Sequence, residues 1–500
     1  MLGSIVSATQ KDAAPSVSFP AVPARDEDEA RSISPQQTDC CIVGGGPAGL
    51  VLSLLLARAG VSVTVLEAHR DFEREFRGNT INPSVLEIME ELGLVDRLLE
   101  LRHAKVPRFT LRSADGSIDF AEFRRLKTRY PYILMLPQAR FLGFVAAEAR
   151  KYPGFRLVMG ARVKELIEED GVVRGVRYRT SEGLREVRAR LTIGADGRFS
   201  QVRRLADLQR VEGSSPIDVF WFNLPRKPDD PECAGAIFRF GPGSLLVLMD
   251  HFDHWQVGYI IEKGSYEQLR TTGLPALRRS VVELAPELAD RVGHLQDWKQ
   301  GSLLSVESDR LRRWYRPGLL LIGDAAHVMS PVGGVGINYA IQDAVVAANV
   351  LGGPLKSGRL QSRHLAAVQR RREWSTRLVQ RAQSVAQRWV VSGALGASEE
   401  FKLPVLLRLL LRTPLLRDLF AYLIAFGAWP VHTRGESASL SSGWENYSAQ
   451  EMKRIAEIGG LGQNERRKDP GRRSLRQGRR RGRRGAARGR VRGAGAGAPG

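Results

Sequence analysis

Residues 38–69, TDCCIVGGGPAGLVLSLLLARAGVSVTVLEAH, decide the fold. A short apolar run leads into three consecutive glycines, an apolar stretch of helical length continues to Gly60, and a second run rich in valine follows. Apolar runs punctuated by glycine in this order predict a buried strand, a tight turn, a helix and a second buried strand. Such a βαβ unit implies an α/β fold with a mainly parallel sheet.

The glycine-rich turn of this unit has the pattern G-x-G-x-x-G. Its first glycine permits a tight turn, its second lets the backbone approach a pyrophosphate, and its third lets the helix pack closely on the strand. The helix start directs N–H groups at the phosphates, and the acid that closes the second strand is placed to accept hydrogen bonds from a ribose. The pattern predicts a dinucleotide site without distinguishing NAD from FAD, formed by Gly44, Gly46, Pro47, Ala48, Gly49, Glu67 and Ala68.

The chain of 500 residues is longer than one hydrophobic core supports, so we expect at least two closely joined domains. The formal net charge of +21 is unevenly distributed, because residues 466–500 carry +13 of it. A globular body with a basic tail therefore fits better than a nucleic-acid-binding chain that is basic throughout. Residues 1–36 and 435–500 have the biased composition of disordered segments.

The three cysteines, Cys40, Cys41 and Cys233, are too few and too poorly spaced for a disulfide framework, which favours a reducing, cytoplasmic location. The N-terminus lacks the basic and apolar regions of a secretory signal. The most apolar segment, residues 403–430, contains three arginines, and the longest uncharged run there, residues 419–431, has 13 residues, shorter than the roughly 18–20 that a spanning helix needs. We expect no transmembrane segment, and helical packing of this segment rather than contact with a membrane surface.

Two further motifs follow, IGADGRFSQVR at residues 193–203 and GDAAHVMSPVGGVGIN at residues 323–338. Each begins where a short apolar run ends in Gly and Asp, as buried parallel strands do. Together with GGGPAG, the motifs resemble the three signatures of the class A flavoprotein monooxygenases, the family with the para-hydroxybenzoate hydroxylase fold. The resemblance extends from about residue 38 to residue 434.

This resemblance implies FAD as the cofactor, held in a Rossmann-like domain, and it implies a role for individual residues. Glu67 would hold the adenosine ribose, and Asp324 would accept a hydrogen bond from a ribityl hydroxyl. From the residues alone, solvated surface positions for Arg77 and Gln138, or a turn position for Asp196, remain open. The remaining residues implied to contact the cofactor are Arg77, Gly78, Gln138, Val163, Asp196, Gly197, Gly323, Pro331, Gly334, Gly336, Ile337 and Asn338.

The glycine cluster of the third motif would let the backbone approach the isoalloxazine ring. The helix that follows would direct N–H groups at the ring edge where negative charge develops on reduction. The family pattern usually has Gln between the last two glycines, whereas this chain has Val335. We therefore expect the backbone contact to survive and a polar side chain facing the substrate to be missing. His327 also follows the pattern, but a histidine beside Pro and Gly is more often a packing or backbone-bonding residue than a catalyst, so we assign it no role.

The resemblance implies a reaction in which NADH or NADPH reduces FAD and the reduced flavin reacts with O₂. A C4a-hydroperoxyflavin then transfers one oxygen atom to a small substrate, which we expect to be aromatic. The cofactor supplies the difficult chemistry, so no nucleophile or metal is required of the protein and no catalytic residue is assigned. This accounts for the lack of a Ser-His-Asp arrangement, of H-E-x-x-H and of a C-x-x-C pair in the sequence.

Residues 217–315 differ in pattern, because β-branched and aromatic residues there alternate around turn signals and predict a mostly antiparallel sheet. We assign this range to a substrate domain, residues 37–216 and 316–360 to the FAD-binding domain, and residues 361–434 to C-terminal helices. The candidates for contact with the substrate are Phe220, Trp221, Phe222, His251, Trp255 and Tyr259. Strand alternation places about half of such side chains on the opposite face, in the core.

Alternative functions are weaker. Flavin-dependent halogenases share the fold but carry W-x-W-x-I-P, and no two tryptophans here are two residues apart. A disulfide reductase would need a redox pair of cysteines, which is absent. An oxidase or reductase that uses the same FAD site without inserting oxygen remains open. The Arg/Gly tail resembles an RNA-binding segment, but it lacks interleaved aromatic residues, so we expect a solvated tail without a nucleic-acid partner.

Overall fold

The structure is a computed structural model that describes residues 36–73, 79–113, 115–213, 215–230, 235–241, 243–391, 408–409, 411 and 413–434. The predictions for Arg77, Gly78 and Cys233, for the first 35 residues and for the basic tail lie outside the described residues.

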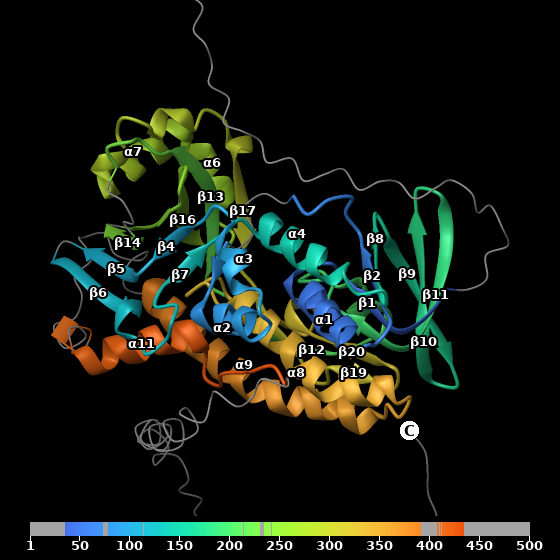
Figure 1. The fold of residues 1–500 in the computed structure, drawn as a ribbon. Helices are drawn as coiled ribbons and strands as arrows, with labels where there is room; N and C mark the ends of the chain where they lie inside the picture. The colour runs from blue at the N-terminus through green and yellow to red at the C-terminus, as the bar shows by residue number, and fades with distance from the viewer. Residues whose placement is uncertain are drawn as a thin grey trace, which may run out of the picture. The chain divides into compact units, whose positions relative to one another are not determined.

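An eight-stranded sheet contains the βαβ unit (Figure 1). Six of its strands run in the order β19 (Tyr315–Arg316), β20 (Leu319–Leu321), β11 (Gly183–Gly194), β1 (Gln36–Val43), β2 (Val63–Glu67) and β8 (Phe155–Met159). In addition, β10 (Val172–Thr180) pairs with β11, and β9 (Arg162–Glu169) pairs with β10. The strands from β20 to β8 pair in parallel, as the sequence predicts. Every residue of β2 and β20 is buried, which is why these strands read as unbroken apolar runs.

The first helix, α1 (Pro47–Arg58), begins at a proline and is followed by Gly60 in the left-handed conformation, so both predicted ends of the helix are confirmed. It packs against α4 (Gln138–Ala149) and α8 (Gly336–Lys356). Helix α8 in turn packs against the long α9 (Ser362–Val390). The glycine-rich turns that precede α1 and α8 therefore lie at the ends of two neighbouring helices.

The second sheet has seven strands and is mostly antiparallel, in the order β17 (Gly301–Ser305), β13 (Ile217–Pro225), β16 (His254–Glu262), β15 (Ser244–Asp250), β14 (Ala236–Gly241), β5 (Arg108–Ser113) and β6 (Gly116–Glu122). The predicted domain boundary differs from the structure here. Strands β5 and β6 come from the range assigned to the FAD-binding domain, and β5 pairs in parallel with β14. This pairing joins residues more than a hundred positions apart, so no local pattern signals it.

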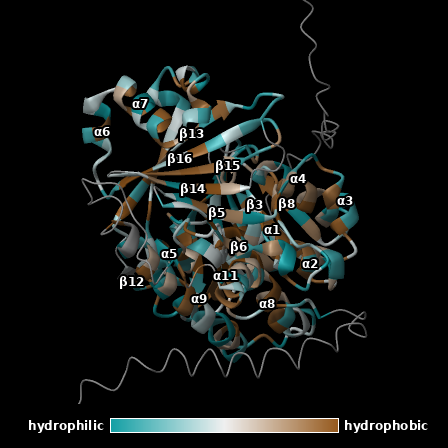
Figure 2. Ribbon diagram, turned by 90° about the vertical axis from the view of Figure 1, so that its left-hand side faces the viewer, coloured by the Kyte–Doolittle hydropathy of each residue, from teal (hydrophilic) through white to brown (hydrophobic). Residues whose placement is uncertain are grey.

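The two faces of this sheet have different neighbours. One face packs against α7 (Leu274–Leu284) and its surroundings in a core that includes Phe220, Phe222 and Tyr259. The opposite face carries a second apolar set that includes Val219 and Trp221 and borders a large cavity. Figure 2 shows that β14, β15 and β16 are mostly apolar, as strands buried on both faces are expected to be.

Two small sheets and several short helices make up the rest of the described fold. One small sheet consists of β3 (Thr80–Ile81), β7 (Ile133–Met135) and β4 (Ala104–Val106), and the other of β12 (Arg210–Gly213), β18 (Ser308–Leu311) and β21 (His327–Val328). The short helices are α2 (Pro83–Glu91), α3 (Val95–Leu99), α5 (Gln201–Leu205), α6 (Tyr266–Thr272), η1 (Phe123–Arg125), η2 (Pro286–Leu288), η3 (Val292–His294), η4 (Trp298–Gln300) and η5 (Gly323–Ala325). Helix α11 (Pro414–Phe426) begins after Thr413, ends before Gly427, and packs against β6 and α2. Among the described residues, no helix combines the length and the apolar character that crossing a membrane requires.

The two faces of the seven-stranded sheet make a prediction about stability. Phe222→Ala removes a fully buried ring from the core face, so the free energy of unfolding should fall by about 3–5 kcal/mol. Phe238→Ala, the matched change on the cavity face, should cost clearly less, because its ring already borders open space. Urea denaturation of both variants measures the difference. Equal losses would contradict this assignment of the two faces.

Candidate active site

A cavity of about 1380 Å³ lies where the strand ends of the eight-stranded sheet approach the seven-stranded sheet. All three sequence motifs contribute to its lining. The predicted residues that border it are Gly44, Gly46, Pro47, Ala48, Glu67, Ala68, Gln138, Val163, Asp196, Gly197, Asp324, Pro331, Gly334, Gly336 and Ile337. Gly49, Gly323 and Asn338 do not line the cavity themselves, although each adjoins a residue that does.

The first glycine turn has the shape that a dinucleotide phosphate requires. Gly44 has φ +108°, and a Cβ there would lie 2.3 Å from the carbonyl oxygen of Ala195. A Cβ on Gly49 would lie 1.9 Å from the carbonyl oxygen of Gly44, so this glycine lets α1 pack on the turn. A Cβ on Gly46 would meet nothing within 4 Å, because this position faces the cavity at the N-terminus of α1. The turn therefore leaves backbone room for a pyrophosphate at a positive helix end.

Glu67 is buried at the end of β2, and its carboxylate holds the first glycine turn by hydrogen bonding. Its Oε2 accepts a hydrogen bond from the backbone N–H of Gly45 at 2.7 Å, and its Oε1 accepts one from the N–H of His69 at 2.9 Å. The same Oε1 lies 2.6 Å from His69 Nδ1. The carboxylate thus links the glycine turn to the segment after β2 while it borders the cavity.

The second motif forms a turn whose carboxylate is directed inward. Asp196 accepts hydrogen bonds from Ser200 Oγ at 2.5 Å and from the N–H of Val202 at 3.0 Å, so its side chain holds the start of α5. Burial raises the pKa of Asp196, although these hydrogen bonds oppose the increase. The buried Arg203 donates to the carbonyl oxygens of Arg198 and Ala325, at 2.6 and 3.2 Å, and joins the second motif to the third. Asp196 and Gly197 therefore border the cavity on a turn that hydrogen bonds hold firmly.

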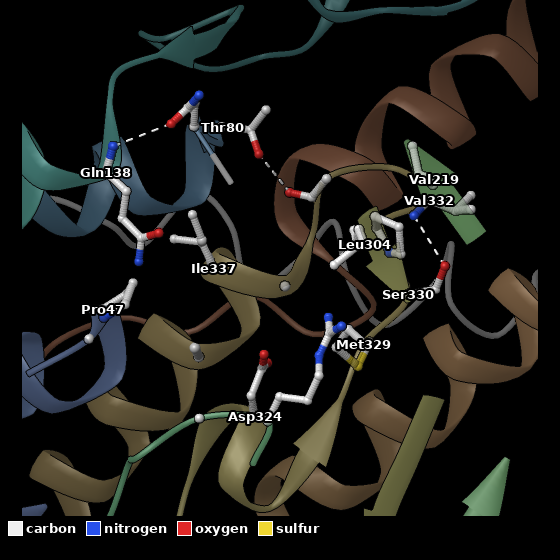
Figure 3. A pocket seen from close by; sticks show the side chains of 18 of the residues that line it. Pro47, Thr80, Gln138, Val219, Leu304, Asp324, Met329, Ser330, Val332 and Ile337 are labelled. Carbon is white, nitrogen blue, oxygen red and sulfur yellow. Dashed lines mark hydrogen bonds between the residues drawn. The ribbon is translucent and has the colours of Figure 1, made fainter. Parts of the chain in front are cut away.

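The third motif forms the floor of the cavity, where Asp324 and Ile337 are directed into the open space (Figure 3). Gly334 has φ +63°, and its carbonyl oxygen accepts hydrogen bonds from Thr80 Oγ1 at 3.0 Å and from Asn338 Nδ2 at 3.1 Å. Asn338 Oδ1 accepts a third from the N–H of Asn82 at 2.8 Å. Asn338 therefore holds the glycine turn in place by its side chain.

Val335 does not face the cavity. It is 5% exposed and packs with Met329 and Tyr339 in a small separate core at the start of α8. The expectation that this position would face the substrate is therefore corrected. A valine is suited to the position because its neighbours there are apolar.

A buried ion-pair cluster that the sequence did not reveal lies behind the floor. Asp343, fully buried in α8, accepts hydrogen bonds from Arg372 Nε at 2.7 Å and from the backbone N–H of Gly323 at 3.0 Å, and it lies 2.6 Å from His327 Nε2. The guanidinium of Arg372 also lies over the ring of Tyr339. His327 thus pairs with a carboxylate instead of only packing. An acid in the apolar stretch AIQDAVV is the signal that points to a buried partner.

Helix α9 fixes the same loop through a row of buried amides. Gln380 Nε2 donates to the carbonyl oxygen of Val328 at 3.0 Å. Gln383 Nε2 donates to the carbonyl oxygens of Ser330 and Val332, at 2.9 and 2.7 Å. Gln387 Nε2 donates to Ser330 Oγ. The three glutamines share one face of the helix, and together they hold the loop that leads into the glycine turn.

The substrate candidates divide between the two faces of the seven-stranded sheet. Trp221 lines the cavity, and its ring lies over Gly258, where a Cβ would come within 2.7 Å of it. The other candidates do not line this cavity, because strand alternation and the end of β15 place them in the core; they are Phe220, Phe222, His251, Trp255 and Tyr259. This corrects the expectation for those five. The aromatic side chains that do line the sheet side are Phe109, Phe120, Trp221, Phe238 and Phe240.

Comparison with known proteins bears on this site. A family model described as an FAD binding domain matches residues 37–382. The chain belongs to this family. 6-Methylpretetramide 4-monooxygenase of Streptomyces rimosus is 36% identical over 403 residues, which are 80% of this chain and 94% of that protein. Para-nitrophenol 4-monooxygenase of Pseudomonas sp. (strain WBC-3) is 27% identical over 331 residues, 63% of this chain and 78% of that protein.

A solved structure supports the fold. p-Nitrophenol 4-monooxygenase PnpA from Pseudomonas putida DLL-E4 superimposes with a TM-score of 0.61 at 22% identity and covers 78% of this chain and 94% of that one. The relatives named here are monooxygenases, and the matched family model is an FAD binding domain, so this chain is an FAD-dependent oxidoreductase of the monooxygenase type. The open backbone at Gly46 and the cavity along the three motifs fit that cofactor.

The two cavity glycines of the first turn make a matched prediction. Gly44→Ala should destabilise the fold, because its left-handed φ and its contact with the backbone of Ala195 leave no room for a methyl group. Gly46→Ala should fold with nearly unchanged stability, yet it should lower the FAD content, because the methyl group projects toward the pyrophosphate. Thermal denaturation and the flavin-to-protein absorbance ratio measure both effects. Full FAD content in a folded Gly46→Ala variant would contradict this reading of the turn.

The buried ion pairs make a second prediction. Burial by itself raises the pKa of Asp343, but His327 and Arg372 outweigh it and lower the pKa to about 2. Because this pKa lies below the usual aspartate value of 3.8, the ionised carboxylate stabilises the fold above that pH, and the stabilisation is lost as the pH falls toward 2. Asp343→Asn leaves Arg372 as an unpaired buried cation, so it should lower the free energy of unfolding by about 3–5 kcal/mol near neutral pH.

The pH dependence of urea unfolding tests this assignment. As the pH falls from about 4 to about 2, the difference in free energy of unfolding between the wild-type protein and Asp343→Asn should disappear. Glu165→Gln is the control, because it makes the same carboxyl-to-amide change in an exposed pair with Arg177 and should cost less than about 1 kcal/mol. Equal effects of the two substitutions would contradict a structural role for Asp343.

Proposed function

We propose that this monooxygenase inserts one oxygen atom into an extended, mainly apolar aromatic substrate of several fused rings, using NADH or NADPH as the electron donor. The observation that carries the proposal is the aromatic wall on the seven-stranded sheet, where Phe120 and Phe238 lie edge to face at 5.5 Å between ring centroids. Planar ring systems pack well on such edge-to-face surfaces. The 36% sequence identity to 6-methylpretetramide 4-monooxygenase supports a substrate of that kind.

The size of the cavity also favours a large substrate. Pockets for a single drug-sized ligand have volumes of about 300–1000 Å³, whereas this cavity measures about 1380 Å³. It therefore leaves space beyond one bound molecule. The three motifs occupy one side of it, and the aromatic wall occupies the other. This division suits a cofactor on the first side and a substrate on the second.

The groups of the protein have supporting roles in this reaction. When bound, FAD supplies the redox chemistry and the activation of O₂. The N-terminus of α8, beside Gly336 and Ile337, directs its positive dipole end at the cavity and favours negative charge there. The apolar wall excludes water, which would otherwise compete for a reactive oxygen species. The hydrogen bonds of α9 hold the loop of residues 328–332 in one position.

A reaction with isotopically labelled oxygen tests the proposal. Purified enzyme with FAD is mixed with NADPH or NADH, ¹⁸O₂ and either 6-methylpretetramide or para-nitrophenol. We expect the larger compound to accelerate oxidation of the nicotinamide cofactor and to gain one labelled oxygen atom, measured by mass spectrometry. Para-nitrophenol serves as the small control and should cause less acceleration, because it covers little of the wall.

Two outcomes would contradict the proposal. A labelled product from para-nitrophenol but none from the larger compound would contradict the size of the substrate. Oxidised product without labelled oxygen would instead favour an oxidase or reductase on the same fold.

We also infer a cytoplasmic location. Cys40 and Cys41 are buried free thiols, which supports this inference.

A further inference from the structure

The aromatic wall contains one conspicuous exception. Fifteen described residues of the seven-stranded sheet line the cavity, and Gln256 is the one among them with an amide, hydroxyl or charged side chain. It is 5% exposed. Burying an amide against apolar neighbours costs roughly 1–3 kcal/mol unless hydrogen bonds compensate. A functional reason for this amide is therefore worth seeking.

The register of the strands places Gln256 at the end of the wall. On one side it pairs with Met249, which in turn pairs with Ala236, and both of these face the cavity. On the other side it pairs with Asn223, which is exposed and does not line the cavity. Two residues further along β16, Gly258 lies beneath the ring of Trp221. The amide therefore borders the same space as this ring, where a planar substrate would lie.

His251 holds one end of this amide from behind. It is fully buried, its Nε2 lies 3.4 Å from Gln256 Oε1, and its ring stacks on His254 at 4.5 Å between centroids. Burial, together with the neighbouring His254, lowers the pKa of His251 to about 4, so the ring is neutral near pH 7. A neutral ring with its proton on Nε2 donates to Gln256 Oε1. The amide NH₂ group of Gln256 is then the end available to the cavity.

We propose that Gln256 determines specificity by donating a hydrogen bond to a carbonyl or phenolic oxygen on the aromatic substrate, and that His251 is its positioning residue. This inference rests on the proposed function, because it assumes an aromatic substrate against the wall. The wall itself recognises ring area and does not discriminate between oxygen patterns. A single oriented donor in an apolar surface selects the ring system that carries an oxygen at that place.

The test uses fluorenone and fluorene, two planar tricyclic probes that differ by a carbonyl in place of a methylene group. Each probe is titrated into the FAD-loaded enzyme, and binding is followed by the change in the flavin absorption spectrum. The measured quantity is the ratio of the two dissociation constants. In Gln256→Leu this ratio should shift toward fluorene by about tenfold, the value of one lost hydrogen bond, while fluorene itself still binds.

Two further variants sharpen the test. Asn223→Leu removes an amide from the paired position outside the cavity, and the ratio should stay at its wild-type value. His251→Phe should shift the ratio in the same direction as Gln256→Leu, because the amide loses its fixed orientation. A purely structural role of His251 would weaken binding of both probes equally and would overturn its assignment.

The outcomes separate the two proposals. If both probes bind and Gln256→Leu leaves the ratio unchanged, the inference on Gln256 fails and the proposed aromatic site stands. If neither probe binds to the wild-type enzyme, the aromatic site itself is wrong and both proposals fall. A tenfold shift confined to the Gln256 and His251 variants supports the inference.

Discussion

The floor of the cavity depends on one buried carboxylate. Asp343 is completely buried, and removing such a charge from water costs several kcal/mol unless partners compensate. Its partners come from three places: the backbone after β20, His327 at β21 and Arg372 in α9. Because the carboxylate itself belongs to α8, one group joins four consecutive parts of residues 323–372. A shift of any of these elements would leave a charge or a donor unpaired, so they have one favourable arrangement.

That arrangement explains the unusual composition of α9. A helix whose buried face carries Arg372, Gln380, Gln383 and Gln387 gains little from the hydrophobic effect, yet its amides satisfy the backbone carbonyls of the loop before the glycine turn. A glycine-rich loop has few side chains of its own to fix its position. Fixing it from behind with side-chain amides keeps its front surface open. The glycine-rich loop therefore depends on the buried polar side chains of α9 to hold it in position.

Much of the fold follows from local sequence. The βαβ unit, the end of α1 near Gly60 and the parallel strands around Leu320 depend on turn residues and apolar runs, and these predictions are confirmed. The joining of β5 to β14 depends on contacts more than a hundred residues apart, and no local pattern encodes it. Among the side chains, His327 has the sequence environment of a packing residue. Its pairing with Asp343 emerges only when β21 and α8 come together.

The substrate side was harder to predict for a physical reason. A sheet that packs on a core with one face and lines an apolar cavity with the other carries apolar residues on both, so alternation is present but its phase cannot be read. The stretch HWQVGYIIE illustrates this, since Trp255 and Val257 face the core while Gln256 faces the cavity. Only departures from the apolar pattern reveal the phase. Gln256 cannot be buried in an apolar core without cost, and Gly258 provides space for a ring, so these two residues mark the cavity face.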